Sequence, residues 1–565
     1  QMCIRDSVSG TWASGNVYHV DCDITIPSGD SLTIEPGVLV RFASGTKLTT
    51  NGKLKVLGTS SDRVNFTSLS PSPLPGDWNN VVLNSPNNII NHLDYDYATN
   101  GFTGNGASGT AIDSLRMVGT LSLTANGIYL ENTTNLSIDN SVISVAGSYG
   151  VYAQNANNSS ITNSTIDGTY SEAAIKMESC IGCTVDNNTM SSNPYRGIWM
   201  NQGFNTIITN NIMDVDYYGI EANDGSYYTL NGNTITINNI NNNSDCRGVY
   251  FYSSESCIVN NNNITITNYS TNFIGILNSA YGSNAIVNGN IIDATLWDST
   301  QCNFYYNNGS SYNAYSISGI NLGDAQEVNS NTILIDQSTY GSAIYVYQEG
   351  SYNIDLSIEN NHIENFMKYS WGGESPAINY SSSYYSGDVL IKNNTIELYG
   401  AAGNGISSSG NSEIIDNIIS YSQNRYTNCY QSQNGNYLWG INIQGDHNVL
   451  RGNMITNFAT GIRLNGFSDN IIDSNTIHTV SSITNNVGNV FNYQNNLYGI
   501  NAQNCDSLFI TNNTITTESG DVIYQTNGAS TIKYNLLETE SGRGIWCENQ
   551  ACLLYTSPSP RDSCA

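Results

Sequence analysis

Hydrophobic and polar residues alternate in short runs along most of the chain, and from about residue 127 the runs repeat as two phrases. One phrase is Gly-Ile-x-apolar, as in residues 127–130 (GIYL) and 197–200 (GIWM). The other is apolar-x-(Asn/Gly/Ser)-Asn-x-Ile, as in residues 391–396 (IKNNTI). Alternation with a period of two predicts strands rather than helices.

The spacing of these phrases indicates a solenoid. Gly-Ile phrases, or their Ala variant, begin at residues 127, 150, 174, 197 and 219, which gives a period of 22–24 residues. Strands that recur once per period stack in parallel, and parallel crossovers are almost always right-handed. We therefore predict an all-β fold, a right-handed parallel β-helix of about sixteen coils, over residues 101–551, preceded by an atypical N-terminal β capping section at residues 8–100.

Aligned coils place one asparagine at the same point of nearly every coil, and we expect these amides to form an internal ladder. Ser141 and Ser164 occupy the first two places, and the asparagines are Asn188, Asn211, Asn233, Asn262, Asn290, Asn331, Asn361, Asn394, Asn417, Asn453, Asn475, Asn513 and Asn535. An amide can donate to one neighbour and accept from the other, so a buried column satisfies itself. The preceding residue is mostly Asn, Gly, Ser or Asp, which predicts a left-handed bend there.

Residues 8–100 carry different phrases, including LTIEPGVLVRF at 32–42 and GDW at 76–78. Together with the NNxI coils that follow, they resemble bacterial secreted right-handed parallel β-helix repeat proteins of the pectate-lyase-like superfold. The resemblance implies the fold and a secreted or cell-surface location. It is weak for activity, because one superfold hosts many functions.

The charge of the chain argues against two classes of partner. The chain has 46 acidic and 18 basic residues, a formal net charge of -28. This opposes binding to nucleic acid, whose affinity comes largely from Lys and Arg on phosphates, and to an anionic membrane surface. No apolar run is long enough to suggest insertion into a membrane.

The two ends do not look like natural protein. MCIRDS at residues 2–7 and CLLYTS at 552–557 can be encoded by opposite strands of one short DNA, as in a transposase sequencing adapter. We therefore interpret residues 1–7 and 552–565 as adapter scars on a metagenomic fragment that is truncated at both ends, so that a native signal peptide would not be visible.

Cysteines predict neither a disulfide scaffold nor a metal site. Of twelve cysteines, three lie in the terminal scars, and the remaining nine are dispersed. Cys180 and Cys183 form a lone CxxC without a second ligand pair at zinc spacing. Two turn cysteines or one local disulfide are the alternatives.

Enzymes of the family that this chain resembles have catalytic signatures that can be sought in its sequence. The family includes polysaccharide lyases and hydrolases; this chain lacks the Asp-Asp and Gly-His-Gly phrases of the hydrolases and the Asp-Pro-His-Asp phrase of the epimerases. A lyase would imply Ca²⁺ as cofactor; otherwise no cofactor or metal is predicted. If catalysis exists, we expect Glu178 and Glu221, one coil apart on a diagonal with Lys176, to supply the acid and base.

The variable position of the Gly-Ile phrase should point outward and forms a candidate binding surface. In six successive coils it is Tyr129, Tyr152, Lys176, Trp199, Glu221 and Tyr250, and the next outward column is Glu131, Gln154, Glu178, Asn201, Asn223 and Tyr252. Exposed rings spaced about 4.8 Å apart would stack on sugar rings, with Glu131 and its neighbours hydrogen-bonding hydroxyls. The alternative is aromatic packing that only stabilises the sheet.

Long insertions gather at one edge of the coils, where they suggest a second binding surface. They fall between the Asn phrase and the next Gly phrase, and they are rich in aromatic residues: Phe304, Tyr305, Tyr306, Tyr312, Tyr315, Tyr426, Tyr430, Tyr437, Trp439, Phe491, Tyr493 and Tyr498. Loops that only pack on one another are an equally simple explanation.

Three functions remain open from the sequence. We expect an extracellular or cell-surface protein that binds a polysaccharide or cell-surface glycan through the aromatic column and the Tyr-rich loops. A polysaccharide lyase or glycoside hydrolase is one alternative, and a structural adhesin or stalk without a ligand site is another.

Overall fold

In the computed structural model, the described residues are 6–120, 126–238, 245–267, 272–279, 284–295, 317–338, 341–348, 355–367, 376–382, 388–400, 403–422, 438–484, 490–492, 497–549 and 552–555. The chain divides into two compact units, residues 1–268 and 269–565. Both consist of strands, and no helix occurs in the described ranges.

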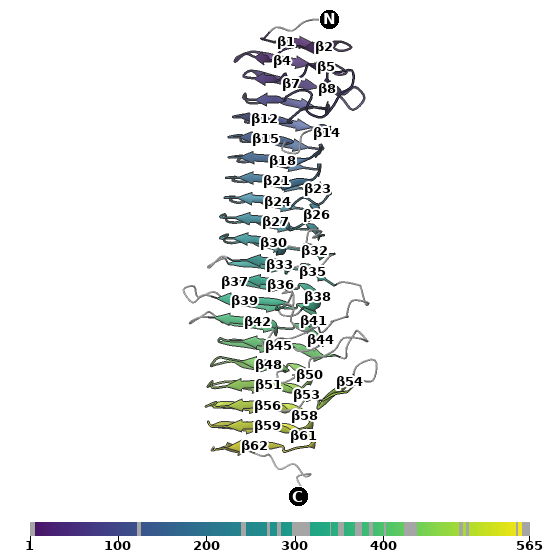
Figure 1. Cartoon of the computed structure of the whole chain (residues 1–565). Helices are drawn as coiled ribbons and strands as arrows, with labels where there is room; N and C mark the ends of the chain where they lie inside the picture. The colour runs from purple at the N-terminus through teal and green to yellow at the C-terminus, as the bar shows by residue number, and fades with distance from the viewer. Residues whose placement is uncertain are drawn as a thin grey trace, which may run out of the picture. The chain divides into compact units, whose positions relative to one another are not determined.

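The first unit is a stack of coils, each made of three short strands, as predicted from the 22–24-residue period (Figure 1). Each strand pairs in parallel with the strand three places later in the chain, so three parallel sheets run along the stack. Sheet I contains β1 (Gly10–Trp12), β4 (Ser31–Ile34), β7 (Lys53–Leu57), β10 (Ile89–Asn91), β13 (Ala111–Asp113), β16 (Ser137–Asp139), β19 (Ser160–Thr162), β22 (Thr184–Asp186), β25 (Ile207–Thr209), β28 (Thr229–Asn231) and β31 (Ile258–Asn260).

The other two sheets of the first unit follow the same order. Sheet II contains β2 (Val17–Val20), β5 (Leu39–Phe42), β8 (Val64–Ser68), β11 (Leu93–Tyr95), β14 (Arg116–Thr120), β17 (Val142–Val145), β20 (Thr165–Asp167), β23 (Thr189–Met190), β26 (Ile212–Val215), β29 (Thr234–Ile237) and β32 (Asn263–Ile266). Sheet III contains β3 (Ile24–Ile26), β6 (Leu48–Thr50), β9 (Val81–Leu83), β12 (Phe102–Asn105), β15 (Ile128–Glu131), β18 (Gly147–Gln154), β21 (Tyr170–Glu178), β24 (Arg196–Asn201), β27 (Tyr218–Asn223) and β30 (Cys246–Tyr252).

The second unit repeats this three-strand coil. Its sheet I contains β34 (Ala285–Asn288), β37 (Ala325–Asn329), β40 (Leu356–Glu359), β43 (Val389–Lys392), β46 (Ser412–Ile415), β49 (Val449–Arg451), β52 (Ile471–Asp473), β57 (Leu508–Thr511), β60 (Ser530–Lys533) and β63 (Cys552–Tyr555). Its sheet II contains β35 (Ile291–Ala294), β38 (Thr332–Ser338), β41 (His362–Met367), β44 (Thr395–Gly400), β47 (Ile418–Tyr421), β50 (Met454–Phe458), β53 (Thr476–Thr479), β58 (Thr514–Ser519) and β61 (Leu536–Ser541).

Sheet III of the second unit contains β33 (Phe273–Asn278), β36 (Ile317–Leu322), β39 (Ile344–Gln348), β42 (Pro376–Ser382), β45 (Asn404–Ser408), β48 (Trp439–Ile443), β51 (Thr460–Asn465), β56 (Tyr498–Gln503), β59 (Asp521–Thr526) and β62 (Ile545–Glu548). A separate antiparallel hairpin joins β54 (Ser482–Thr484) to β55 (Val490–Asn492). The predicted register is confirmed where charged residues test it: Glu359 pairs with Lys392 and Arg451 with Asp473.

The asparagine ladder is present in both units, at the turn between sheet I and sheet II. In the first unit, Asn188 donates from its backbone N and from Nδ2 to Oδ1 of Asn211, both at 3.0 Å, and Nδ2 also donates to the carbonyl of Ile161 at 2.9 Å. The Oδ1 of Asn188 accepts from the backbone N of Ser164 at 3.0 Å. Each amide thus bonds the coil on either side, as the sequence predicted.

The left-handed bend predicted before each ladder asparagine is also confirmed. The backbone φ is positive at Asn187, Asn210, Gly232, Asn261, Gly289, Ser330, Asn360, Asn393, Asp416, Gly452, Ser474 and Asn512. A second ladder, not predicted, lies at the turn between sheets III and I: Asn448 donates from N and Nδ2 to Oδ1 of Asn470 at 2.8 and 3.0 Å, and its own Oδ1 accepts from Ser412.

Inward side chains of the three sheets fill each stack with branched aliphatic residues, which are almost all inaccessible to solvent. Most coils carry glycine at the first position of the Gly-Ile phrase, where neighbouring coils approach closely. A Cβ on Gly219 would lie 2.4 Å from Cγ2 of Ile235 and 2.5 Å from the carbonyl oxygen of Gly248. A larger residue at Gly219 would therefore require its neighbours to shift, whereas Ala174 is accommodated at the equivalent place in its own coil.

Residues 8–100, expected as a capping section, supply strands β1–β11, which pair within the same three sheets. Their core contains a cluster of aromatic rings. The ring of Phe42 stacks on Trp78 with centroids 4.1 Å apart, and Nε1 of Trp78 donates to the carbonyl of Asp96 at 2.7 Å. These rings share the first coils with aliphatic side chains such as Ile24, Leu32 and Leu54.

Candidate functional site

The predicted outward column lies on sheet III of the first unit, and we call it, with its neighbouring column, the stripe. Six strands from β15 to β30 carry it in continuous register: Tyr129, Tyr152, Lys176, Trp199, Glu221 and Tyr250 pair in that order, as do Glu131, Gln154, Glu178, Asn201, Asn223 and Tyr252. The coil alignment from the sequence is therefore correct throughout the stripe.

The expected exposure of the stripe is wrong at its centre. Tyr152, Lys176 and Glu221 are only 6%, 9% and 7% exposed. The reason is that stripe residues pack on one another and on a flanking row that the repeat phrases did not reveal. That row includes Tyr149, Arg196 and Arg247, which contact the stripe through ring and guanidinium groups.

The first part of the stripe is a stack of rings with a lysine at its end. Tyr129 and Tyr152 stack with centroids 4.5 Å apart and planes 20° apart. The Nζ of Lys176 lies 5.2 Å from the Tyr152 centroid and 3.9 Å from that of Trp199. Because ring faces contact neighbours along the stack, these inner rings have little free face for a sugar.

Carboxylates of the second column accept hydrogen bonds from this stack. The hydroxyl of Tyr129 donates to Glu131 at 3.1 Å, and that of Tyr152 donates to Glu178 at 2.9 Å. The Nζ of Lys176 lies 3.4 Å from the same Glu178 oxygen. Glu178 is thereby held between a phenol and an ammonium group.

Arg196 organises the middle of the stripe. Its guanidinium forms a close ion pair with Glu221 through Nε and another with Glu172, at 3.6 Å through NH1. Its Cζ also lies 4.5 Å from the centroid of Trp199. Nδ2 of Asn223 donates to the other oxygen of Glu221 at 2.9 Å.

The last part of the stripe offers the most accessible ring. Arg247 lies over Tyr250, with Cζ 4.1 Å from the ring centroid, and is within 4.0 Å of Asp245. Tyr252 is 51% exposed and only loosely tilted against Tyr250, with centroids 6.4 Å apart. Of the predicted aromatic residues, Tyr252 best meets the expectation of an open stacking surface.

Burial and the neighbouring carboxylates keep Tyr129 and Tyr152 protonated. Burial raises the pKa of Tyr152, and the hydrogen bond to Glu178 raises it further. Burial also raises the pKa of Tyr129, with a further contribution from Glu131. These phenols therefore remain hydrogen-bond donors at neutral pH.

The acid–base geometry expected for catalysis is not formed by the predicted pair. Glu178 lies on β21 and Glu221 on β27, with β24 between them, so they are two coils apart and not one. Stacked strands are about 4.8 Å apart, so this is about 10 Å along the stack. Each carboxylate is also held by its own cation, Lys176 or Arg196.

The predicted insertion loops fall largely outside the described residues. This applies to Phe304, Tyr305, Tyr306, Tyr312, Tyr315, Tyr426, Tyr430, Tyr437 and Tyr493. Phe491 lies in the hairpin strand β55, Trp439 is 7% exposed at the start of β48, and Tyr498 stacks on Tyr524 with centroids 4.6 Å apart.

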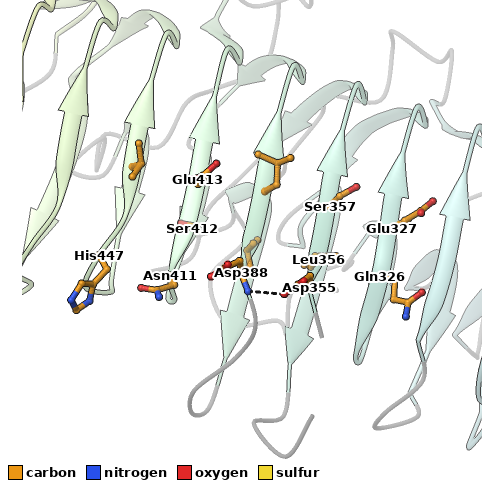
Figure 2. Close-up of a pocket in the computed structure, with 13 residues that line it drawn as sticks. Gln326, Glu327, Asp355, Leu356, Ser357, Asp388, Asn411, Ser412, Glu413 and His447 are labelled. Carbon is orange, nitrogen blue, oxygen red and sulfur yellow. Dashed lines mark hydrogen bonds between the residues drawn. The ribbon is translucent and has the colours of Figure 1, made fainter. Parts of the chain in front are cut away.

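A groove that the sequence did not predict lies on sheet I of the second unit (Figure 2). It has a volume of about 600 Å³ and is lined by carboxylates from four successive coils, at Glu327, Asp355, Asp388 and Glu413, with His447 at one end. The strand register brings Glu327 and Glu413 into one column, whereas Asp355, Asp388 and His447 precede their strands, where the sequence carries no constant phrase.

The CxxC predicted as two turn cysteines or a local disulfide is resolved by the structure. Cys180 and Cys183 form a disulfide, one of the two alternatives for the CxxC. In the ranges that the structure describes, no three His, Cys, Asp or Glu side chains are grouped so as to hold a metal ion. Nor does any helix in those ranges have the length and apolarity needed to cross a membrane.

Comparison with known proteins agrees with the fold. Residues 100–264 match the family described as right handed beta helix region, so the predicted right-handed parallel β-helix is confirmed. No curated protein matches the sequence.

Among solved structures, the periplasmic alginate epimerase AlgG, as a mutant, is 12% identical over 56% of this chain and 73% of its own, with a TM-score of 0.36. The tailspike protein of E. coli bacteriophage HK620, a mutant in complex with a hexasaccharide, is 12% identical over 69% and 71%, with a TM-score of 0.37. The surface adhesin PfbA of Streptococcus pneumoniae is 12% identical over 71% and 84%, with a TM-score of 0.27. We draw no conclusion about this chain from likenesses with TM-scores this low.

Proposed function

We propose that the first unit binds a polysaccharide along the stripe and that the protein works outside the cytoplasm, secreted or at a cell surface. The observation that carries this proposal is the continuous register of aromatic, carboxylate and amide side chains over six coils on one face of sheet III. A chain of sugars presents hydroxyls and apolar ring faces at regular intervals, so a repeating surface of this kind matches it.

The geometry supports a division of labour within the stripe. Tyr252, with its exposed ring, is the residue suited to stack on a sugar. The carboxylates Glu131 and Glu178, and the amides of the same column, are suited to accept or donate hydrogen bonds. The inner rings Tyr152 and Trp199 act mainly by holding those groups in place, because their faces contact neighbouring side chains.

Two further observations favour binding in an extracellular setting. Glu178 and Glu221 are each held in an ion pair and lie two coils apart, which supports a binding role for them rather than acid–base catalysis. The Cys180–Cys183 disulfide supports an oxidising compartment, since disulfides persist there and are rare in the cytosol.

The test is a glycan array with the whole chain, followed by titration of the best ligand into the parent and into Tyr252→Ala. Stacking on an aromatic ring contributes about 1–3 kcal/mol for nucleic-acid bases, so a comparable sugar contact predicts a loss of about 5- to 150-fold in affinity. Tyr534→Ala is the matched control, because Tyr534 is 67% exposed and lies in the second unit. Binding that is equal in parent and Tyr252→Ala, or no binding to any glycan, would refute the proposal.

A further inference from the structure

We infer that the ligand of the stripe is an uncharged, hydroxyl-rich glycan, and that Lys176 and Arg196 are positioning residues that fix carboxylate acceptors rather than groups that bind charge on the ligand. This inference rests on the proposed function and adds the chemical class of the ligand to it.

The cations of the stripe are already engaged within the protein. Lys176 is shared between Glu178 and the rings of Tyr152 and Trp199. Arg196 is shared between Glu221, Glu172 and the ring of Trp199. The Lys176 and Arg196 side chains are only 11% and 15% exposed. A ligand carboxylate or sulfate would have to approach either cation beside the protein carboxylate that already pairs with it, and the two like charges would repel.

The more accessible carboxylates keep capacity to accept. An ionised carboxylate offers about four lone-pair positions. Glu178 and Glu172, whose side chains are 22% and 46% exposed, pair with Lys176 and Arg196 respectively, and Glu178 also accepts from the Tyr152 hydroxyl. The oxygens are thereby fixed in orientation while lone pairs remain for hydroxyl donors. Preorganised acceptors bind a hydroxyl without first losing conformational freedom.

The balance of charge points the same way. Strands β15, β18, β21, β24, β27 and β30 carry four carboxylates, and Asp245 directly precedes β30, so five acids face three cations, for a net charge of -2. The cation side chains are 11–19% exposed, whereas those of Glu172 and Asp245 are 46% and 55% exposed. An approaching polyanion therefore meets mostly negative charge, on a chain whose net charge is -28.

The first experiment compares uncharged glycans with uronate-containing and sulfated ones on the array, and then measures how the affinity of the best ligand depends on salt. We expect the ligands to be uncharged, with affinity nearly constant between about 0.01 and 1 M ionic strength, where the screening length falls from about 30 to about 3 Å. An acidic ligand whose affinity falls steeply with salt and is lost in Tyr252→Ala would overturn this inference while leaving the proposed function intact. An acidic or uncharged ligand that binds Tyr252→Ala as well as the parent would instead overturn the proposed function.

The second experiment separates positioning from direct contact at Lys176. In Lys176→Met, we expect the affinity for the uncharged glycan to fall about tenfold, equivalent to about 1.4 kcal/mol, with no change in its salt dependence. Lys176→Arg should restore most of the loss because it again pairs with Glu178. Lys392→Met, in the second unit, should leave binding unchanged.

Two results would contradict the positioning role. One is an unchanged affinity in Lys176→Met. The other is an affinity that depends on salt in the parent and no longer does so in that variant, which is the signature of direct charge contact. If Lys176→Met does not fold, Glu178→Gln replaces it, since it keeps the shape of the acceptor and removes its charge. An unchanged affinity in Glu178→Gln would equally overturn the role of fixed acceptors.

Discussion

Replacing Asn394 by alanine should destabilise the second unit far more than a surface change two residues away. Asn394 is fully buried. Its Oδ1 accepts from the backbone N and Nδ2 of Asn361, at 3.0 and 2.9 Å, and its Nδ2 donates to Oδ1 of Asn417 and to the carbonyl of Ile358, at 2.9 and 2.8 Å. Alanine removes all four bonds and can replace none of them.

The size of the expected loss of stability follows from the hydrogen bonds that each partner of Asn394 retains. The backbone N–H of Asn361 loses its acceptor, and a stranded buried donor costs about 1–3 kcal/mol. The other three bonds contribute about 0.5–1.5 kcal/mol each, although Nδ2 of Asn361 keeps a second acceptor at the carbonyl of Val328. Since such terms are not additive within one network, we expect a total loss of about 3–5 kcal/mol.

Urea unfolding followed by circular dichroism measures the global effect, and native-state hydrogen exchange of the Asn361 amide measures the local one. A repeat protein can unfold in parts, so the local measurement is needed. The control is Lys392→Ala on the outer face of the same coil, which should cost under about 1 kcal/mol, as surface charges generally do. If both variants unfold alike, or the Asn361 amide stays as protected as in the parent, the ladder does not stabilise the fold as argued.

Three further outcomes are expected. Burial opposes ionisation of Asp473, but hydrogen bonds from the next coil and a nearby arginine lower its pKa in the folded protein. The ionised carboxylate should stabilise the fold fully above the unfolded pKa near 3.9, and this stabilisation should disappear as pH falls through the lower folded pKa. Acid unfolding of the parent and of Asp473→Asn should therefore converge at low pH. Gly219→Ala places a Cβ 2.4 Å from an isoleucine methyl carbon, so it should lower the free energy of unfolding by about 1–3 kcal/mol in thermal unfolding. Gly544→Ala, with open space around it, should lower it by less than about 1 kcal/mol. Equal losses would contradict the close approach at Gly219. Arg196→Met leaves the buried carboxylate of Glu221 without its cation and should lower the free energy of unfolding by about 3–5 kcal/mol. Arg451→Met, at an ion pair whose arginine side chain is 55% exposed, should lower it by under about 1 kcal/mol. A loss at Arg196 no larger than that at Arg451 would show that water replaces the guanidinium at Glu221.

Features that depend on the repeat alone were predictable. The register of the stripe, the inward asparagines and the left-handed residues before them all follow from one alignment, because each coil meets the same neighbours at the same point. The pairing of Glu359 with Lys392 tests that alignment and agrees with it. In such a fold, spacing in the sequence translates directly into position.

Features that depend on side-chain packing between columns were not predictable. The burial of Lys176 and Glu221 arises from Arg196 and Tyr149, which lie outside the repeated phrases. The pairing of β18 with β21 also shifts register between Gly147 and Tyr149, so the flanking row does not follow the period. The ladder through Asn448 was missed for the same reason, since its turn carries no constant phrase.

The asparagine ladder also bears on how such a chain can lengthen. Every ladder amide presents its oxygen to the preceding coil and its nitrogen to the following one. Any coil with an asparagine at this point can therefore make the same hydrogen bonds with its neighbours. Removal of residues 188–210 would bring Asn211 to the place of Asn188, with both ladder contacts restored. Removal of half as many residues would instead bring a residue from another part of the coil to that place. Duplication or loss of whole coils is therefore the tolerated path of genetic change, and the number of coils can vary among descendants of one gene while the cross-section stays constant.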